Sequence, residues 1–372
     1  MRWSLSLGKV FGINIRIHIT FFLLLFFIFI SVLNEKGAGK AVLATLFICA
    51  VFVCVVIHEI GHSLIARRFG KEAKSITLLP IGGVAAMEEM PEKPSQEIKM
   101  SIAGPFINLV IAGILYLLVG RWTGIGVSSS FPDSARTFLG GLIGVNILLA
   151  IFNLIPAFPM DGGRVLRGIL AMKMDYVRAT STAVFIGQSL AVLFIFFGIF
   201  FNWWLAFIGV FLYIGAGSER QQVLLRSFLR QVPVSEAMTT EFRLLRPDDS
   251  LRRALEHFHH GCQDDFPVIG ENGIEGILTR ERILASIHEK GLDVPVSEVM
   301  ERTFDSVEPD TPLDDVYKKL LSSKKTAVAV VDQNSVKGMI RLDGISRYFM
   351  IKAAMSNIDV DSILPRPMKK QS

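Results

Sequence analysis

Two histidines and a glutamate are the residues of this chain whose types and spacing are most suited to chemistry. They stand in the segment His58-Glu59-Ile60-Gly61-His62. On a helix, residues four positions apart share one face, so both imidazoles can reach a single metal ion. Glu59 would then be placed to hold and deprotonate a water molecule at a bound zinc ion. The pattern predicts a catalytic zinc site. The structural alternative is a pair of interfacial histidines near a helix end.

A third protein ligand is expected, because catalytic zinc sites commonly use three protein ligands and leave one position open. Asp161 is the one acidic residue in or at the edge of the uncharged apolar run 137–160. Pro156 and Pro159 should break the helix just before it, and the paired glycines Gly162 and Gly163 should let the backbone approach closely. The alternative role for Asp161 is a helix N-cap, since a helix could start at Gly162.

The charges of the predicted site balance. A Zn²⁺ ion, two neutral histidines and the carboxylates of Glu59 and Asp161 sum to zero, which lowers the cost of burying them. We therefore expect His58, His62 and Asp161 to bind one zinc ion.

These residues lie in a chain that is too apolar for an ordinary soluble enzyme. Of its 372 residues, 51% are hydrophobic and 20% charged, whereas soluble domains carry about 25% charged residues. A bilayer core needs about 20 apolar residues in a helix. The long stretches without Asp, Glu, Lys or Arg are 17–34, 41–58, 100–120, 137–160 and 179–218. The last is long enough for two helices, with a break near Asn202, so we expect six spans.

Lysines and arginines gather on one side of these spans and predict the orientation. Residues 1–230 contain 20 Lys and Arg against 11 Asp and Glu, whereas residues 231–372 contain 19 against 23. Basic clusters precede the first span and follow the second, fourth and sixth. Both termini, together with His58, His62 and Asp161, should therefore lie on the cytoplasmic side. The basic excess lies between apolar runs rather than on one face, so we expect no nucleic-acid partner.

Together these motifs resemble the site-2 protease family of intramembrane zinc metalloproteases. The matching segments are His58-Glu59-Ile60-Gly61-His62, Asn153 with Pro156 and Asp161-Gly162-Gly163, Leu79-Pro80-Ile81-Gly82-Gly83-Val84, and Ala103-Gly104-Pro105-Phe106-Ile107-Asn108. The resemblance covers residues 1–220 and implies a transmembrane zinc metalloprotease domain there. It implies His58, His62 and Asp161 as the metal ligands. It implies Glu59 as the general base.

The resemblance also implies roles beyond the metal ligands. Asn153 would help to hold the substrate carbonyl or the developing oxyanion, and its alternative is an interhelical hydrogen bond. The segment with Gly82 and Gly83 would form a re-entrant β-like element whose edge could pair with an unwound substrate, and its alternative is a plain surface turn. We interpret Gly104 and Asn108 as structural, since such residues let membrane helices pack closely.

The implied substrate is a membrane-spanning protein that is cleaved in or near its transmembrane helix, as in regulated intramembrane proteolysis. A helix hides its backbone amides in its own hydrogen bonds. The substrate would therefore have to unwind in part before its peptide bond could be attacked.

The C-terminal part contains an internal repeat. Val232-Pro233-Val234-Ser235-Glu236-Ala237-Met238 returns 62 residues later as Val294-Pro295-Val296-Ser297-Glu298-Val299-Met300. Each copy is expected to form a strand, a helix, two apolar strands and a helix, and the copies should pack together. The repeat resembles a CBS-domain pair. We assign 221–232 to a linker, 233–291 and 292–352 to the two copies, and 353–372 to a C-terminal tail.

CBS pairs often bind adenine nucleotides and regulate an attached membrane protein. Here the residues depart from the usual nucleotide pattern. The first copy has Thr279 but carries Arg282 where an aspartate would bind ribose, and the second has Arg341 and Gly344 in the threonine and aspartate places. These departures speak against nucleotide binding and leave a homodimer contact or a docking module as other roles.

The sequence thus predicts a polytopic α-helical membrane protein of about six transmembrane helices, followed by a soluble α+β CBS-domain pair. Its predicted function is that of a zinc endopeptidase. The alternatives are a CBS-regulated membrane transporter or channel and a catalytically silent scaffold. A transporter would need polar residues spread along several spans, whereas here they converge at two helix ends.

Overall fold

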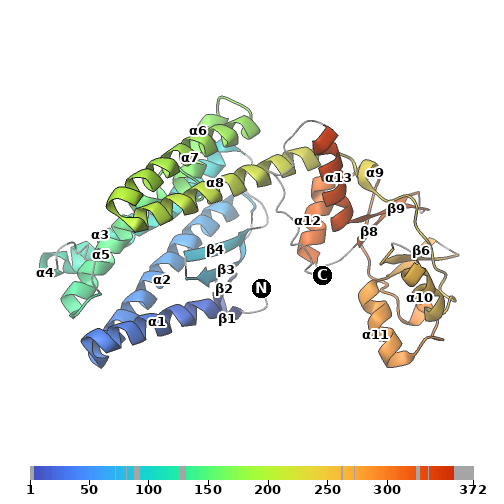
Figure 1. Ribbon diagram of the computed structural model, residues 1–372, viewed down its shortest axis with the longest axis horizontal. Coiled ribbons are helices and arrows are strands. Elements are labelled where there is room, and N and C mark those ends of the chain that lie inside the picture. The colour runs from blue at the N-terminus through green and yellow to red at the C-terminus, as the bar shows by residue number, and fades with distance from the viewer. Residues whose placement is uncertain are drawn as a thin grey trace. The chain divides into compact units, whose positions relative to one another are not determined.

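The chain forms two compact units, Met1–Arg220 and Gln221–Ser372, and each is described by itself. The computed structural model describes residues 4–71, 73–80, 82–87, 93–123, 125, 131–260, 263–271, 273–323, 327–333 and 335–355. Figure 1 shows the first unit as a set of long helices beside a small sheet.

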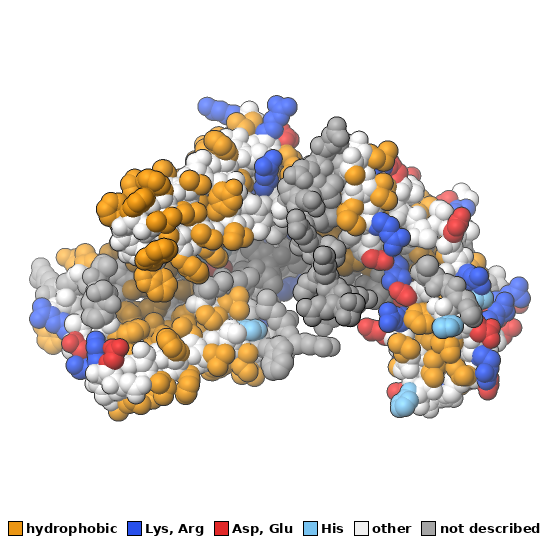
Figure 2. Space-filling view, in the orientation of Figure 1, with side chains coloured by type: hydrophobic (Ala, Val, Ile, Leu, Met, Phe, Trp, Pro, Cys, Tyr) orange, Lys and Arg blue, Asp and Glu red, His pale blue; other side chains and the backbone are white. Residues whose placement is uncertain are grey.

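Five helices among the described residues are long and apolar enough to cross a membrane. They are α1 (Ile19–Lys36), α2 (Ala38–Arg68), α3 (Pro94–Leu115, continued as a π-helix to Gly120), α5 (Ala135–Asn153) and α7 (Tyr176–Phe201). On the face that Figure 2 shows, hydrophobic side chains cover much of the helical unit. Phe27 and Phe185 are 70% and 71% exposed. Exposed aromatic side chains of this kind suit contact with lipid.

The five helices agree approximately with the prediction of about six spans. Helix α8 (Trp203–Arg230) begins after a break at Asn202, where the sequence predicts one. Its uncharged part ends at Ser218, however, because Glu219 and Arg220 follow. Helix α8 is not among the five helices, and it stays the candidate for the sixth predicted span.

A four-stranded sheet lies at the base of the first unit. Its strands β1 (Ser4–Val10), β2 (Ile13–His18), β3 (Ala73–Leu79) and β4 (Gly82–Met87) are neighbours in that order. The pair β2–β3 is parallel and the other two pairs are antiparallel. Ile13, Ile15 and Ile76 form a buried cluster with Ile60 of α2, so the sheet packs on the helix that carries both histidines.

Helix α3 lies at the centre of the helical layer, in contact with α2, α5 and α6 (Asp161–Ala171). Close packing is possible because α3 buries small side chains, Ser101, Gly104 and Ala112 among them. The short segment 154–160 joins the end of α5 to the start of α6. Helices α2, α3 and α6 and the segment 154–160 therefore surround His58, His62 and Asp161.

The second unit contains the two repeats. The first copy comprises α9 (Val234–Ala237), α10 (Leu251–His260), β5 (Phe266–Gly270), β6 (Gly273–Leu278) and α11 (Arg280–Lys290). The second comprises the 3-10 turn η2 (Val296–Glu298), β7 (Ser306–Val307), α12 (Leu313–Ser323), β8 (Ala327–Asp332), β9 (Ser335–Arg341) and α13 (Leu342–Met355). The expected helices and apolar strand pairs are present in both. The expected first strand is present in the second copy as β7, which pairs in parallel with β8, whereas the first copy has an isolated bridge between Leu245 and Val268 at this place.

The two copies exchange their leading segments. Val234, at the start of the first copy, and Val232 just before it are buried in the core of the second copy with Leu313. Val296 and Met300, near the start of the second copy, are buried in the core of the first. Each core is therefore completed by residues from the other copy. Residues 221–230, assigned above to a linker, continue α8, and the tail from residue 356 lies outside the described residues.

Candidate metal centre

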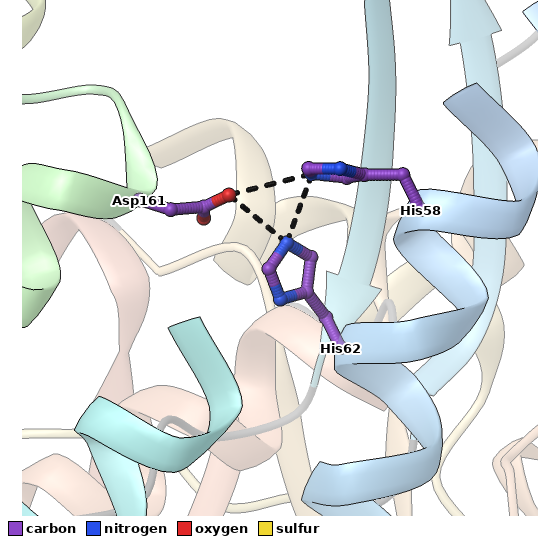
Figure 3. A group of neighbouring side chains, drawn as sticks. All are labelled: His58, His62 and Asp161. Carbon is purple, nitrogen blue, oxygen red and sulfur yellow. Dashed lines mark hydrogen bonds and ion pairs between the residues drawn. The ribbon is translucent and has the colours of Figure 1, made fainter. Parts of the chain in front are cut away.

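Three side chains from two helices converge at the predicted metal site. His58 Nε2 lies 3.3 Å from Asp161 Oδ2, and His62 Nε2 lies 3.1 Å from the same oxygen. The two Nε2 atoms are 3.1 Å apart. All three residues are buried, and their donor atoms lie within 4.8 Å of one another, as a metal site requires. Figure 3 shows the two imidazoles and the carboxylate pointing towards one common point.

The histidines are placed by the helical repeat of α2. They are separated by one turn, and their rings meet edge to face with centroids 4.7 Å apart. Asp161 is the first residue of α6, and the N-cap of that helix is Met160. The alternative of an N-cap role for Asp161 is therefore not what the structure shows.

A glycine pair lets α6 start beside the connection that precedes it. A Cβ on Gly162 would lie 2.3 Å from the carbonyl oxygen of Ile155, and one on Gly163 would lie 2.7 Å from the backbone nitrogen of Phe158. Contacts this short are not tolerated, so only glycine allows the 154–160 segment to fold back on α6. The position of Asp161 depends on that fold.

Each histidine is held through its second ring nitrogen by helix α3. His62 Nδ1 lies 2.7 Å from the carbonyl oxygen of Met100, and His58 Nδ1 lies 2.5 Å from Asn108 Oδ1. A carbonyl oxygen can only accept, so Nδ1 of His62 carries the proton and donates it. The same assignment for His58 leaves both Nε2 lone pairs free for a metal. This is the usual arrangement behind metal-binding histidines.

Asn108 is itself held by a second asparagine. Its Nδ2 donates to Asn146 Oδ1 over 3.0 Å, and Asn146 Nδ2 donates to the carbonyl oxygen of Leu142 over 2.9 Å. Both asparagines are fully buried. The sequence interpretation of Asn108 as a packing residue is therefore incomplete, because its amide orients a histidine of the predicted site.

The space around the donor atoms fits a metal ion. A Cβ on Gly104 would lie 2.3 Å from His62 Nε2 and 2.5 Å from His58 Nε2. Glycine therefore keeps open the volume in front of both nitrogens. Two imidazole nitrogens and a carboxylate oxygen are a donor set that zinc takes in catalytic sites, so the residues present fit the ion.

Glu59 lies beside the cluster, where β4 approaches α2. The glutamate is half-buried, and a Cβ on Gly83 would lie 2.9 Å from its Cγ. The segment around Gly83 is a strand, as the resemblance implies, and not a plain turn. Among the described residues, β4 is an edge strand that pairs with β3 alone. Within these residues, the other edge of β4 has no strand beside it.

Asn153 is not part of the cluster. It is the last residue of α5 and is half-buried. Within the described ranges, its side chain makes no hydrogen bond to His58, His62 or Asp161, and none across to another helix. Its amide is therefore open to a ligand.

In the CBS pair, Thr279 and Arg341, which stand in places of the usual nucleotide pattern, bond to other groups of the protein. Thr279 is the N-cap of α11 and accepts a hydrogen bond from the backbone nitrogen of Arg282. Arg341 pairs with Asp264 at 2.7 Å and with Asp343 at 3.2 Å. These two carboxylates neutralise the charge of the Arg341 guanidinium group, so that it is less able to attract a phosphate group.

Comparisons with known proteins agree with both parts of the chain. The profile of peptidase family M50 matches residues 46–196, and that of the CBS domain matches residues 234–289 and 296–351. The chain is 35% identical over 353 residues to zinc metalloprotease MJ0392 of Methanocaldococcus jannaschii. The aligned region covers 94% of this chain and 97% of that protein. It is 28% identical over 174 residues to stage IV sporulation protein FB of Bacillus subtilis, covering 46% and 54%.

Among solved structures, the site-2 protease from Methanocaldococcus jannaschii is 37% identical. It covers 59% of this chain and 95% of that chain, with a TM-score of 0.44.

Proposed function

This chain belongs to peptidase family M50, the site-2 proteases, and from that premise we propose that His58, His62 and Asp161 hold its zinc ion. It is a multi-pass membrane zinc metalloendopeptidase with a CBS pair, and the comparisons do not favour a transporter. The observation that carries the proposal is the convergence of three buried donor atoms from α2 and α6 within 4.8 Å. The acceptors behind both histidines support it, since they turn each Nε2 towards that point.

Glu59 is the general base of the proposed reaction. A bound zinc ion lowers the pKa of water to about 7 and polarises a carbonyl group. Glu59 takes a proton from the attacking water as the new carbon–oxygen bond forms. It then delivers that proton to the leaving amine as the carbon–nitrogen bond breaks, a role that general acid–base groups commonly fill.

The substrate is a peptide segment that lies extended beside β4. An edge strand offers unpaired backbone groups, and an extended peptide can add to it as a further strand. Gly83 of β4 contacts Glu59, so a segment paired there would pass the general base. Asn153 lies one connection before Asp161, and its amide would donate to the substrate carbonyl oxygen. A transmembrane helix that unwinds at its end would supply such a segment.

The second unit is a cytoplasmic regulatory module in this proposal. The charge distribution along residues 1–230 supports a cytoplasmic location for both termini and the CBS pair. The ion pairs of Arg341 with Asp264 and Asp343 support regulation by a docked partner or a second copy rather than by a nucleotide.

The decisive test replaces Glu59 by glutamine, which keeps the size of the side chain and removes the base. The Glu59→Gln protein should bind one zinc ion and cleave a helical membrane substrate at least about a hundredfold more slowly, the usual scale for loss of a general base. Glu35→Gln is the matched control, since Glu35 is exposed at the end of α1. Full cleavage by Glu59→Gln would exclude Glu59 as the base.

A further inference from the structure

A buried arginine joins the helices around the metal site. Arg167 of α6 is 1% exposed. Its Nε donates to Glu97 Oε1 of α3 over 2.8 Å, and its Nη2 donates to the same oxygen. Its Nη1 donates to Glu219 of α8 over 2.7 Å. One guanidinium group therefore connects three helices, and Glu97 is fully buried beside it.

Two aromatic rings complete the surroundings of Arg167. Its guanidinium carbon lies 5.0 Å from the ring centroid of Phe158 and 5.0 Å from that of Tyr176, the first residue of α7. Phe158 is fully buried in the connection that leads to Asp161. Arg167 thus contacts the segment before Asp161 as well as the helix after it.

The connected elements are those that hold the proposed ligands. Asp161 is the first residue of α6, six positions before Arg167 and about 9 Å away along the helix axis. Helix α3 supplies Met100 and Asn108, which support the two histidines. The bond from Arg167 to Glu97 therefore fixes the helix that bears the carboxylate against the helix that orients both imidazoles.

On the basis of the proposed zinc site, we propose that Arg167 is a positioning residue that holds Asp161 at the metal. Its planar fork bonds two carboxylates at once, which a lysine ammonium cannot reproduce. Removing a buried charge from its partner is costly, so the ion pairs of Arg167 with Glu97 and Glu219 keep α6 in its place. The same guanidinium group also holds α8 through Glu219.

The test measures metal binding rather than cleavage. Purified full-length Arg167→Lys and Glu219→Gln proteins are titrated with zinc against a chelator, and cobalt is used to record the absorption spectrum of the site. We expect Arg167→Lys to bind zinc about tenfold or more weakly, the scale found for groups that orient metal ligands. Its cobalt spectrum should shift towards that of Asp161→Asn. Glu219→Gln should show a smaller change in the same direction.

Arg178→Lys is the matched control, because Arg178 is exposed on α7. It should bind zinc and cobalt as the unchanged protein does. If Arg167→Lys folds and keeps both the zinc affinity and the cobalt spectrum, the inference is wrong. If Arg167→Lys does not fold, an unchanged zinc affinity and cobalt spectrum of Glu219→Gln would also show that the inference is wrong.

These outcomes are separate from those of the proposed function. A protein that binds zinc through Asp161 but still cleaves after Glu59→Gln would refute the proposed base and leave the role of Arg167 standing. An unchanged chain that binds zinc no better than Asp161→Asn would refute the ligand set and the inference together.

Discussion

Gly104 is the residue whose replacement should affect the metal site most directly. A Cβ there would lie 2.3 Å and 2.5 Å from the Nε2 atoms of His62 and His58. We expect Gly104→Ala to weaken zinc binding at least about tenfold, since ligand atoms must move away from the methyl group. Metal analysis of the purified protein and chelator competition measure this effect.

The control for this substitution lies on the same helix. A Cβ on Gly113 would meet nothing within 4 Å, so Gly113→Ala should leave zinc affinity unchanged and favour the helix slightly. Equal zinc affinities for the two variants would show that Gly104 does not border the metal.

At the residue level, the sequence predicts the groups that the structure brings together at the site. The four-residue spacing of His58 and His62 and the isolated carboxylate of Asp161 were enough. The supporting role of Asn108 was not predictable in this way, because its partner lies on another helix 50 residues away. The signal that could have found it is the presence of two amides, Asn108 and Asn146, within otherwise apolar spans.

At the level of elements, the close approach of β4 to α2 should control the position of Glu59. A Cβ on Gly83 would lie 2.9 Å from Glu59 Cγ and 3.3 Å from Val55 Cγ1. We expect Gly83→Ala to keep the zinc content and to lower kcat by about tenfold or more, because small displacements of a catalytic group are costly. Measured cleavage rates with zinc content on the same samples test this.

Gly39→Ala serves as the comparison. Gly39 lies in α2, the helix that carries Glu59, and a Cβ there meets nothing within 4 Å. It should cleave at the unchanged rate. If Gly83→Ala cleaved the substrate as fast as Gly39→Ala, β4 would not constrain the general base.

Elements formed by local patterns were predicted more fully than those formed by distant pairing. The apolar runs identify α1, α2, α3, α5 and α7. The first two strands were not predicted, because β2 pairs in parallel with β3, and paired residues such as Ile15 and Ile76 are 61 positions apart in the chain. Such a partner cannot be recognised from a short stretch such as 13–18. The sixth predicted span corresponds to α8, in which Glu219 and Arg220 follow the uncharged part that ends at Ser218.

At the level of the whole molecule, the distribution of basic residues leads to a prediction of topology. Green fluorescent protein joined to the C-terminus should fluoresce in bacterial cells, because that end is predicted to be cytoplasmic. Alkaline phosphatase joined after Asn202, between α7 and α8, should be active, because that turn is predicted on the opposite side. The reverse result for both reporters would refute the orientation and place the metal centre at the other membrane face.

The two-unit organisation was visible in the sequence as an apolar part followed by a repeat. The exchange of leading segments between the repeats was not. Val234 and Val296 occupy equivalent places in the two copies, and the pattern is equally compatible with each segment packing in its own core. Only the folded chain distinguishes these arrangements, since both bury the same residue types.

The two histidines differ in how their supports respond to genetic change. The partner of His58 is the side chain of Asn108, so a single codon can abolish it. The partner of His62 is the main-chain oxygen of residue 100, which every amino acid possesses. If every position of α3 is mutated and inactive variants are collected, substitutions at position 108 should be among them, because they remove the acceptor of His58. Alleles at position 100 could act only through the bulk of the side chain.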